Sequence, residues 1–174
     1  MTISVIAAIT NNNAIGRKNE LLFRIKEDLK RFRELTTGNV VIMGMNTYLS
    51  IGKPLPNRAN LILSSKNENN DENIFPSMEE CLEYCRKYYD NKEIFIIGGG
   101  MVYKTAMETD IADKLYITRI YATVEDADTF FPEIDEDKWE LTDTDVRFGE
   151  DMLKYEFQTF VKKDSKTFGQ SEIM

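Results

Sequence analysis

The pattern of apolar and polar positions predicts a sheet made mostly of buried parallel strands. Four segments rich in apolar residues each end in glycine or polar residues: 3–9, 40–44, 60–64 and 94–97. Nearly unbroken apolar runs are typical of strands that are covered on both faces of a parallel sheet. Because the chain opens directly on the first of these runs, we expect that strand near the middle of the sheet.

Helices are predicted between the strands. Residues 26–36 place Leu29, Phe32 and Leu35 on one stripe at helical spacing. Ser77 is suited to cap a following helix, and Glu80 completes a capping box. The other helices are predicted over residues 46–50, 78–89 and 101–107.

The C-terminal half predicts further strands. Residues 114–123 form a long strand, and 139–146 and 152–161 form a hairpin whose second arm alternates with period two. The pattern ends after this arm, so residues 162–174 are expected to be a frayed tail. A short strand is expected at 74–75. This order predicts an α/β fold with a doubly wound, mostly parallel sheet and an antiparallel C-terminal strand, in one domain over residues 1–161.

The segment 10–20 is rich in asparagine and has no period of either kind. We expect a long loop without regular structure. Its embedded Ile15 and the following Leu21, Leu22 and Phe23 are too apolar for a fully solvated loop. The segment is therefore interpreted as a flap that packs on another part of the molecule.

Composition narrows the function. The chain of 174 residues has a net charge of −8, which argues against nucleic acid or an anionic membrane as its partner. It contains no histidine, so Ser-His-Asp and Cys-His catalysis and most zinc enzymes are excluded. Any proton transfer must use a carboxyl, Lys, Tyr, Cys or water.

Cys81 and Cys85 are interpreted as partly buried free thiols rather than a metal site. Few cysteines and no signal peptide favour the cytoplasm.

Three predicted strands end in groups that can hold anions. These ends are Gly44-Met45-Asn46-Thr47, Ser64-Ser65-Lys66 and Gly98-Gly99-Gly100. Ligands of such sheets bind outside the carboxyl ends of the strands, and helix N-termini favour phosphate. Each end alone could be an ordinary turn or polar loop, but together they predict a long, multiply charged cofactor such as a dinucleotide. Asp28 alone is read most simply as an acid that favours the N-terminus of its helix.

Together these residues resemble the dihydrofolate reductase family over roughly residues 1–161. The resemblance rests on motifs in the family's order and spacing: Ile6-Ala7-Ala8, Ile15-Gly16, Asp28-Leu29 with Phe32, Val41-Ile42-Met43-Gly44, the run from Ser50 to Arg58, Leu63-Ser64-Ser65, the run from Ile97 to Tyr103, Thr118, and the run from Asp128 to Pro132.

The resemblance implies the reduction of dihydrofolate to tetrahydrofolate for one-carbon and thymidylate metabolism. It implies that Asp28 binds the 2-amino group and N3 of the pterin and promotes protonation of N5, while hydride passes to C6. Thr118 is expected to orient Asp28, and Leu21 to touch the nicotinamide ring. Arg58 is expected to clamp the substrate's α-carboxylate, and Arg33 to add a weaker contact to the glutamate tail. The other implied substrate contacts are Ile6, Ala7, Leu29, Phe32, Ile51, Lys53, Leu55, Ile97 and Tyr103.

The implied cofactor is NADPH. Gly98-Gly99 resembles the family's cis peptide, and residues 10–24 resemble its mobile loop over the nicotinamide. The implied cofactor contacts are Ala8, Ile15, Gly16, Asn19, Glu20, Gly44, Met45, Asn46, Thr47, Leu63, Ser64, Ser65, Lys66, Gly98, Gly99, Gly100, Met101, Val102 and Tyr103.

The chain departs from the family at some positions. Met45, Asn46 and Met101 stand where many members carry basic residues that grip the cofactor's phosphates, and Phe23 stands where Trp is common. We therefore expect a smaller preference for NADPH over NADH than is typical. A monomer with no metal is expected. Two other functions stay open: a non-catalytic protein that binds pterins or nucleotides, and a reductase of the same fold that acts on a riboflavin precursor.

Overall fold

The computed structural model describes residues 1–17 and 20–163, and its strands form two sheets. The large sheet has eight strands in the order β10-β11-β8-β1-β7-β4-β5-β6, and the small one has the order β3-β2-β9. The strands of the large sheet are β1 (Thr2–Thr10), β4 (Val40–Gly44), β5 (Ala59–Leu63), β6 (Ile74–Phe75), β7 (Glu93–Ile96), β8 (Lys114–Ile120), β10 (Trp139–Phe148) and β11 (Lys154–Lys162).

The direction of the strands confirms the predicted fold class. β1 pairs in parallel with β7 and β8, and the same direction continues through β4, β5 and β6. β11 pairs antiparallel with both β8 and β10. β1 is the fourth of the eight strands, so the prediction of a central first strand is also confirmed.

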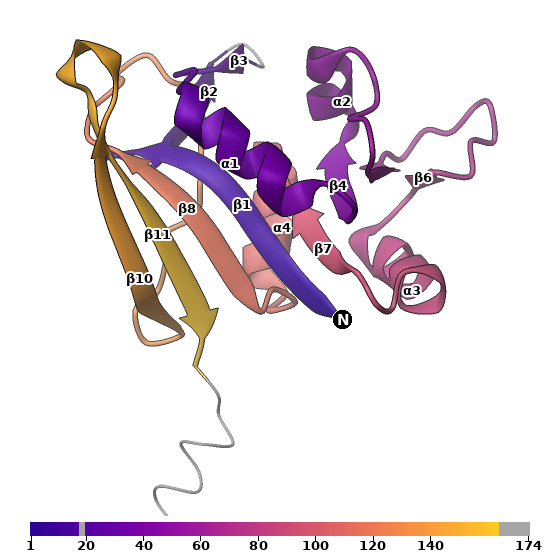
Figure 1. The fold of residues 1–174 in the computed structure, drawn as a ribbon. Coiled ribbons are helices and arrows are strands. Elements are labelled where there is room, and N and C mark those ends of the chain that lie inside the picture. The colour runs from indigo at the N-terminus through magenta and orange to yellow at the C-terminus, as the bar shows by residue number, and fades with distance from the viewer. Residues whose placement is uncertain (18–19, 164–174) are drawn as a thin grey trace, which may run out of the picture.

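Helices cover both faces of the large sheet (Figure 1). One apolar cluster joins α3 (Met78–Tyr88) and α4 (Gly100–Glu108) to β1, β4, β5, β7 and β8. A second cluster, on the other face, joins α1 (Lys26–Thr36) and α2 (Met45–Ile51) to the sheet. Alternate residues of β4 point to opposite faces of the sheet. Val40 and Ile42 belong to the first cluster, and Val41 and Met43 belong to the second.

The prediction of an unstructured segment over residues 10–20 is wrong. The chain there forms β2 (Ala14–Arg17) and β3 (Glu20–Leu21), which build the small sheet with β9 (Thr129–Phe130). Ala14 pairs with Phe130, and the N–H of Phe131 donates to the carbonyl of Asn13 over 2.7 Å. The pairing partners lie more than a hundred residues away, so the local sequence pattern gives no sign of them.

Several predicted boundaries also change. The long strand β8 ends at Ile120 rather than at residue 123. The expected tail begins too early, because β11 runs through Lys162 and the N–H of Lys163 donates to the carbonyl of Lys138. Residues 164–174 lie outside the described residues. Cys81 and Cys85 are fully buried rather than partly buried. The expected cap of α3 is present, because Ser77 Oγ accepts from the N–H of Glu80.

Candidate active site

The centre of the candidate site is a carboxylate and a hydroxyl that come from two distant elements. Asp28 lies in the first turn of α1, where an acid favours the helix dipole. Thr118 lies on β8, and its Oγ1 donates a hydrogen bond of 2.5 Å to Asp28 Oδ1. The predicted partnership of these two residues is therefore present.

The charge state of Asp28 depends on three opposing effects. Burial raises the pKa of Asp28, while the hydrogen bond from Thr118 and the positive charge of Arg31 lower it. Burial is the largest of the three, so the pKa of Asp28 is raised above its ordinary value. A carboxyl of this kind keeps its proton to a higher pH than an exposed aspartate does.

Several apolar residues that are predicted to contact the substrate lie on the same face of the sheet as α1. Ile6, Leu55 and Ile97 pack against the second apolar cluster, on the face of α1. Leu29 and Ile51 are the most exposed of the predicted apolar substrate contacts, at 41% and 36%. They belong to α1 and α2, the two helices on this face of the sheet.

Tyr103 connects α4 to the same region from the other side of the sheet. Its hydroxyl donates to the carbonyl of Ile6 over 2.8 Å. The resemblance assigns the carbonyl of Ile6 to the pterin amino group. In the structure this carbonyl already accepts a hydrogen bond from Tyr103. Burial and then the charge of Asp28 raise the pKa of the Tyr103 phenol. Tyr103 therefore stays a neutral donor at physiological pH.

A pair of cations lies at the C-terminal end of α1. The guanidinium of Arg58 donates from Nε to the carbonyl of Pro56 over 2.8 Å and from Nη1 to Thr36 Oγ1 over 3.0 Å. Its Cζ lies 6.0 Å from the centre of the Phe32 ring. Burial and then the charge of Arg33 lower the pKa of Arg58, so the two cations are close enough to repel each other. Lys53 is exposed in the turn that follows α2. Two neighbouring arginines suit a ligand with carboxylates.

Two helix N-termini meet at the glycine-rich strand ends. α2 begins after Gly44 and α4 after Gly99, and neither N-cap residue provides a side-chain hydrogen bond. The N–H of Gly44 donates to the carbonyl of Gly98 over 2.9 Å, and the Gly98–Gly99 peptide is cis as expected. The free N–H groups and dipoles of both helices favour an anion at this place.

The glycines are required by close neighbours. A Cβ on Gly44 would lie 3.2 Å from Val102 Cγ2, and one on Gly99 would lie 3.2 Å from Thr47 Oγ1. On Gly98, whose φ is +123°, a side chain would be strained and would meet the ring of Tyr103. Side chains at these three positions would therefore press against residues of α2 and α4.

The third predicted anion-binding end lies beside the first. Leu63 at the end of β5 is in register with Gly44 at the end of β4. Beyond it, Ser64 Oγ accepts from the N–H of Lys66 over 3.2 Å, so this hydroxyl helps to shape its own turn. Ser65 and Lys66 are exposed.

The remaining predicted cofactor residues are more widely spread. Ala8 is in register with Thr118, and Gly16 pairs with Thr129 in the small sheet. Met101 is exposed at 75%. Asn19 and the side chains of Glu20 and Leu21 lie outside the described residues, so the expected contact of Leu21 stays a prediction. Of the other predicted cofactor contacts, Ile15 and Val102 pack beside the first apolar cluster, Met45 packs beside the second, and Asn46 is exposed in α2. Ala7, a predicted substrate contact, is buried in β1.

The sequence analysis missed one residue near Asp28. Arg31 lies three positions later on α1, and its Cζ is 4.4 Å from the centre of the Phe157 ring and 5.7 Å from that of Tyr116. In the sequence it stands among exposed charged positions of a helix, so the pattern gave no reason to single it out.

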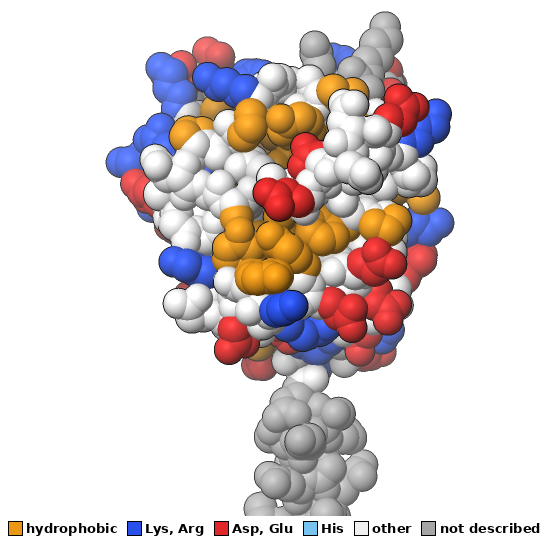
Figure 2. Space-filling view, turned by 90° about the vertical axis from the view of Figure 1, so that its right-hand side faces the viewer, with side chains coloured by type: hydrophobic (Ala, Val, Ile, Leu, Met, Phe, Trp, Pro, Cys, Tyr) orange, Lys and Arg blue, Asp and Glu red, His pale blue; other side chains and the backbone are white. Residues whose placement is uncertain are grey.

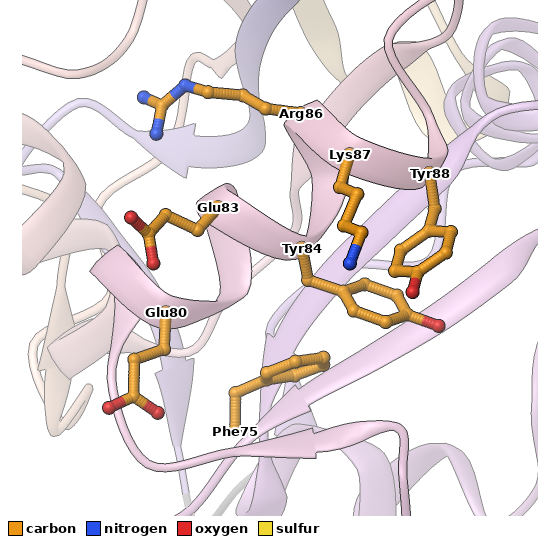
Figure 3. Close-up of a pocket in the computed structure, with 7 residues that line it drawn as sticks. All are labelled: Phe75, Glu80, Glu83, Tyr84, Arg86, Lys87 and Tyr88. Atoms are coloured by element: carbon orange, nitrogen blue, oxygen red, sulfur yellow. The ribbon is translucent and has the colours of Figure 1, made fainter.

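A second feature lies away from this site. An aromatic groove on α3 is lined by the residues that Figure 3 shows: Phe75, Glu80, Glu83, Tyr84, Arg86, Lys87 and Tyr88. Figure 2 shows apolar side chains gathered near the centre of the face that carries α2, β6 and α3, with charged side chains around them. None of the predicted site residues lines this groove.

Two further properties concern the described residues only. They contain no group of three or more His, Cys, Asp or Glu side chains that could hold a metal ion. None of their helices is long and apolar enough to cross a membrane.

A doubly wound sheet whose glycine-ended strands lead into helix N-termini is the arrangement of an α/β protein that binds its ligand at the carboxyl ends of the strands. The comparisons with known proteins then give the family. The chain belongs to the dihydrofolate reductase family, whose model matches residues 2–162.

Relatives of similar length support this assignment. The dihydrofolate reductase of Haemophilus influenzae is 40% identical over 157 residues, which cover 90% of this chain and 94% of the relative. That of Bacillus subtilis is 35% identical over 174 residues, covering 96% and 98%. A solved structure of the Enterococcus faecalis dihydrofolate reductase, complexed with NADP(H) and RAB-propyl, gives a TM-score of 0.81 at 32% identity, covering 94% of this chain and 97% of the other.

Proposed function

We propose that the chain reduces dihydrofolate to tetrahydrofolate with NADPH, by hydride transfer to C6 and protonation at N5 of the pterin. The observation that carries this proposal is the Asp28–Thr118 hydrogen bond in a sheet whose glycine-ended strands lead into the N-termini of α2 and α4. The product would serve one-carbon and thymidylate metabolism in the cytoplasm, and the two buried free thiols suit that reducing compartment.

Asp28 is proposed to bind the pterin and to promote protonation of N5. A carboxylate accepts two parallel hydrogen bonds from the amino group and N3 of an aminopyrimidine. Its raised pKa lets Asp28 hold a proton nearer to neutral pH, from where it can promote protonation of N5 through water. Thr118 fixes the direction of the carboxyl by donating to Oδ1.

The pocket walls and the tail contacts complete the proposed substrate site. Leu29, Phe32, Ile51 and Leu55 would form apolar walls around the pterin and the benzoyl ring. Arg58 would bind the α-carboxylate, supported by Arg33 and Lys53. This proposal is supported by the bonds from Arg58 to Pro56 and Thr36, which fix the plane of the guanidinium before a ligand arrives.

NADPH fits the glycine-rich edge of the sheet and supplies the hydride when bound. We propose that the main-chain N–H groups after Gly44 and Gly99 hold its diphosphate, because they lie at the N-termini of α2 and α4. Thr47 would add its hydroxyl, and Lys66 with Ser64 and Ser65 would bind the 2′-phosphate. Ala8, Ile15 and Gly16 would approach the nicotinamide.

The choice between NADPH and NADH is proposed to be weaker than in most of the family. Met45 and Met101 provide no positive charge, and Asn46 provides only an amide. Lys66 is then the main cation for the 2′-phosphate. Every residue in this proposal comes from residues 1–161 of one chain, so we propose the monomer and this single domain as the catalytic unit.

Turnover with dihydrofolate tests the proposal. NADPH oxidation is followed by the absorbance of the reduced nicotinamide, for the wild type and for Asp28→Asn, with NADH in parallel. We expect turnover that falls by a factor on the order of 10² or more near neutral pH in Asp28→Asn, the range typical of a lost acid–base group. Lys66→Gln should raise the KM for NADPH and leave that for NADH unchanged.

Binding measurements separate the alternatives. Tight binding of dihydrofolate to the wild type with no turnover would favour a non-catalytic pterin-binding protein. Turnover with a riboflavin precursor in place of dihydrofolate would favour the other reductase. An unchanged rate in Asp28→Asn would contradict the proposed role of the carboxyl.

A further inference from the structure

Beyond the groups that touch substrate and cofactor, the structure points to an additional residue that acts on the reaction. We propose that Arg31 is a positioning residue, which is clamped on the rings of Phe157 and Tyr116 and holds a fixed positive charge next to the Asp28–Thr118 pair. This charge sets the pH range over which the enzyme transfers hydride rapidly. The inference deepens the proposed function and rests on it.

The position of Arg31 is fixed from two sides. On α1 it follows Asp28 by three residues, and side chains at this spacing are neighbours on one face of a helix. Across the sheet, its Cζ lies 4.4 Å from the centre of the Phe157 ring. Phe157 on β11 is directly in register with Thr118 on β8. The cation is therefore packed on the residue beside the donor to Asp28.

The second ring belongs to the strand that carries Thr118. Tyr116 lies two residues earlier on β8, so its side chain leaves the same face of the sheet as that of Thr118. Its ring centre is 5.7 Å from Arg31 Cζ. Two aromatic faces suit a planar guanidinium, which stacks on rings better than an ammonium does. The half-buried Arg31 therefore has less freedom to turn toward water than a lysine on the helix surface.

The electrostatic effect of this placement is reciprocal. Arg31 lowers the pKa of Asp28 and so opposes the effect of burial. Burial is the largest effect on Arg31 and lowers its pKa, while Asp28, Tyr116 and Asp145 raise it and offset part of that lowering. Arg31 stays charged at every physiological pH, because an arginine does not lose its proton in proteins.

Other ionisable groups face this region, and most of them are paired with one another. Glu27 on α1 accepts from the hydroxyl of Tyr155 over 2.8 Å and from Arg147 over 3.1 Å. Arg147 on β10 also pairs with Asp145 over 2.9 Å. The pKa values of Tyr103 on α4 and Tyr155 on β11 are raised, first by burial, and the charge of Asp28 adds to both increases. Lys114 lies 4.8 Å from the other ring of the clamp, that of Tyr116.

This arrangement provides a matched control. The Cζ of Arg147 also faces the ring of Phe157, at 5.9 Å, but its charge is neutralised by Asp145 and Glu27 and is largely exposed. Removing that charge should therefore have little effect on Asp28. Removing the charge of Arg31 leaves the carboxyl with only the hydrogen bond from Thr118 to oppose burial.

The test compares Arg31→Gln, Arg31→Lys and Arg147→Gln with the wild type. The rate of hydride transfer is measured in single turnovers across a range of pH. We expect the alkaline midpoint of the profile to rise by about one pH unit in Arg31→Gln, which is the lower end of the effect of a nearby opposite charge. Above the midpoint the rate should then be up to about tenfold higher than in the wild type. Arg31→Lys should return most of the shift, and Arg147→Gln should leave the profile unchanged.

A second measurement does not depend on turnover. Carbon NMR titration of aspartate-labelled protein, with the Asp28 signal assigned from its absence in Asp28→Asn, follows the carboxyl directly without substrate. The pKa of Asp28 should rise in Arg31→Gln and in Arg31→Met, and the second variant serves if the first does not fold.

The outcomes are distinguishable. An upward shift in both measurements, returned by lysine, supports the inference. An unchanged Asp28 titration in the folded charge-free variants, or the same shift with lysine as with glutamine, overturns it. If the wild type binds dihydrofolate but does not reduce it, the proposed function fails, while the NMR titration still decides the effect of Arg31.

Discussion

Replacing Asp28 by asparagine is expected to make the folded protein more stable at neutral pH while it removes most of the activity. The reason is that burial raises the pKa of Asp28 in the folded state. An acid of this kind stabilises the fold while it is protonated. The contribution is complete below the pKa of the unfolded chain, about 3.9, and is lost as the pH rises through the folded-state pKa.

The magnitude follows from proton linkage. Between the unfolded-state and folded-state pKa values, the free energy of unfolding falls by at most about 1.4 kcal/mol per pH unit, because one proton is involved. Asp28→Asn keeps an oxygen that can accept from Thr118 and carries no charge, so it avoids this loss. For an m-value of about 2 kcal/mol/M, a difference of 1.4 kcal/mol would move the urea midpoint by about 0.7 M.

Urea denaturation of both proteins at several pH values measures the difference. The variant should have the higher midpoint at neutral pH and almost the same midpoint near pH 4, below which both side chains are neutral. Asp126→Asn is a control, because Asp126 is 70% exposed in its ion pair with Arg17 and loses only a surface contact. A variant that is less stable than the wild type by the same amount at every pH would refute the reasoning.

Three other changes test the packing around the site. In Gly100→Ala the new Cβ would lie 2.6 Å from Thr129 Cγ2, so we expect a loss of about 1–3 kcal/mol in thermal unfolding, which the added change Thr129→Ser should largely restore. Phe95→Ala should cost about 3–5 kcal/mol by chemical denaturation, because the ring is fully buried in the core, and a loss below 1 kcal/mol would contradict this. Cys81 and Cys85 should react with a thiol reagent only after unfolding, because both are buried, and the hydrogen bond with Cys85 and then burial raise the pKa of Cys81.

The parts of the fold that the sequence predicts are those whose signals are local. α1 spans Lys26–Thr36 as predicted, and β4 spans Val40–Gly44, because the helical stripe and the apolar run each lie within one element. The cap at Ser77 is a contact between neighbours in sequence. The small sheet was missed because Ala14 needs Phe130 to form its pair, and no pattern within residues 10–20 contains that partner.

In the candidate site, too, only the features with a local sequence signal could be predicted. The strand ends at Gly44 and Gly98 could be predicted, because glycine before a helix has a clear backbone meaning. The functional role of Asp28 could not be predicted from its position alone, because an acid in the first turn of a helix is common. The resemblance of the chain to the family indicated this role. Arg31 was missed altogether, because only the folded sheet brings Tyr116 and Phe157 to its guanidinium.

The position of β1 in the sheet has a consequence during synthesis. β1 is made before the other strands of the large sheet, yet both of its neighbours, β7 and β8, come from residues after 92. About 110 further residues separate the end of β1 at Thr10 from the end of β8 at Ile120. At about 5–20 residues per second, an apolar strand waits on the order of 5–20 seconds on the ribosome before its sheet can close. During that time Val5 and Ile9, which are fully buried in the finished protein, are open to chaperones and to other nascent chains.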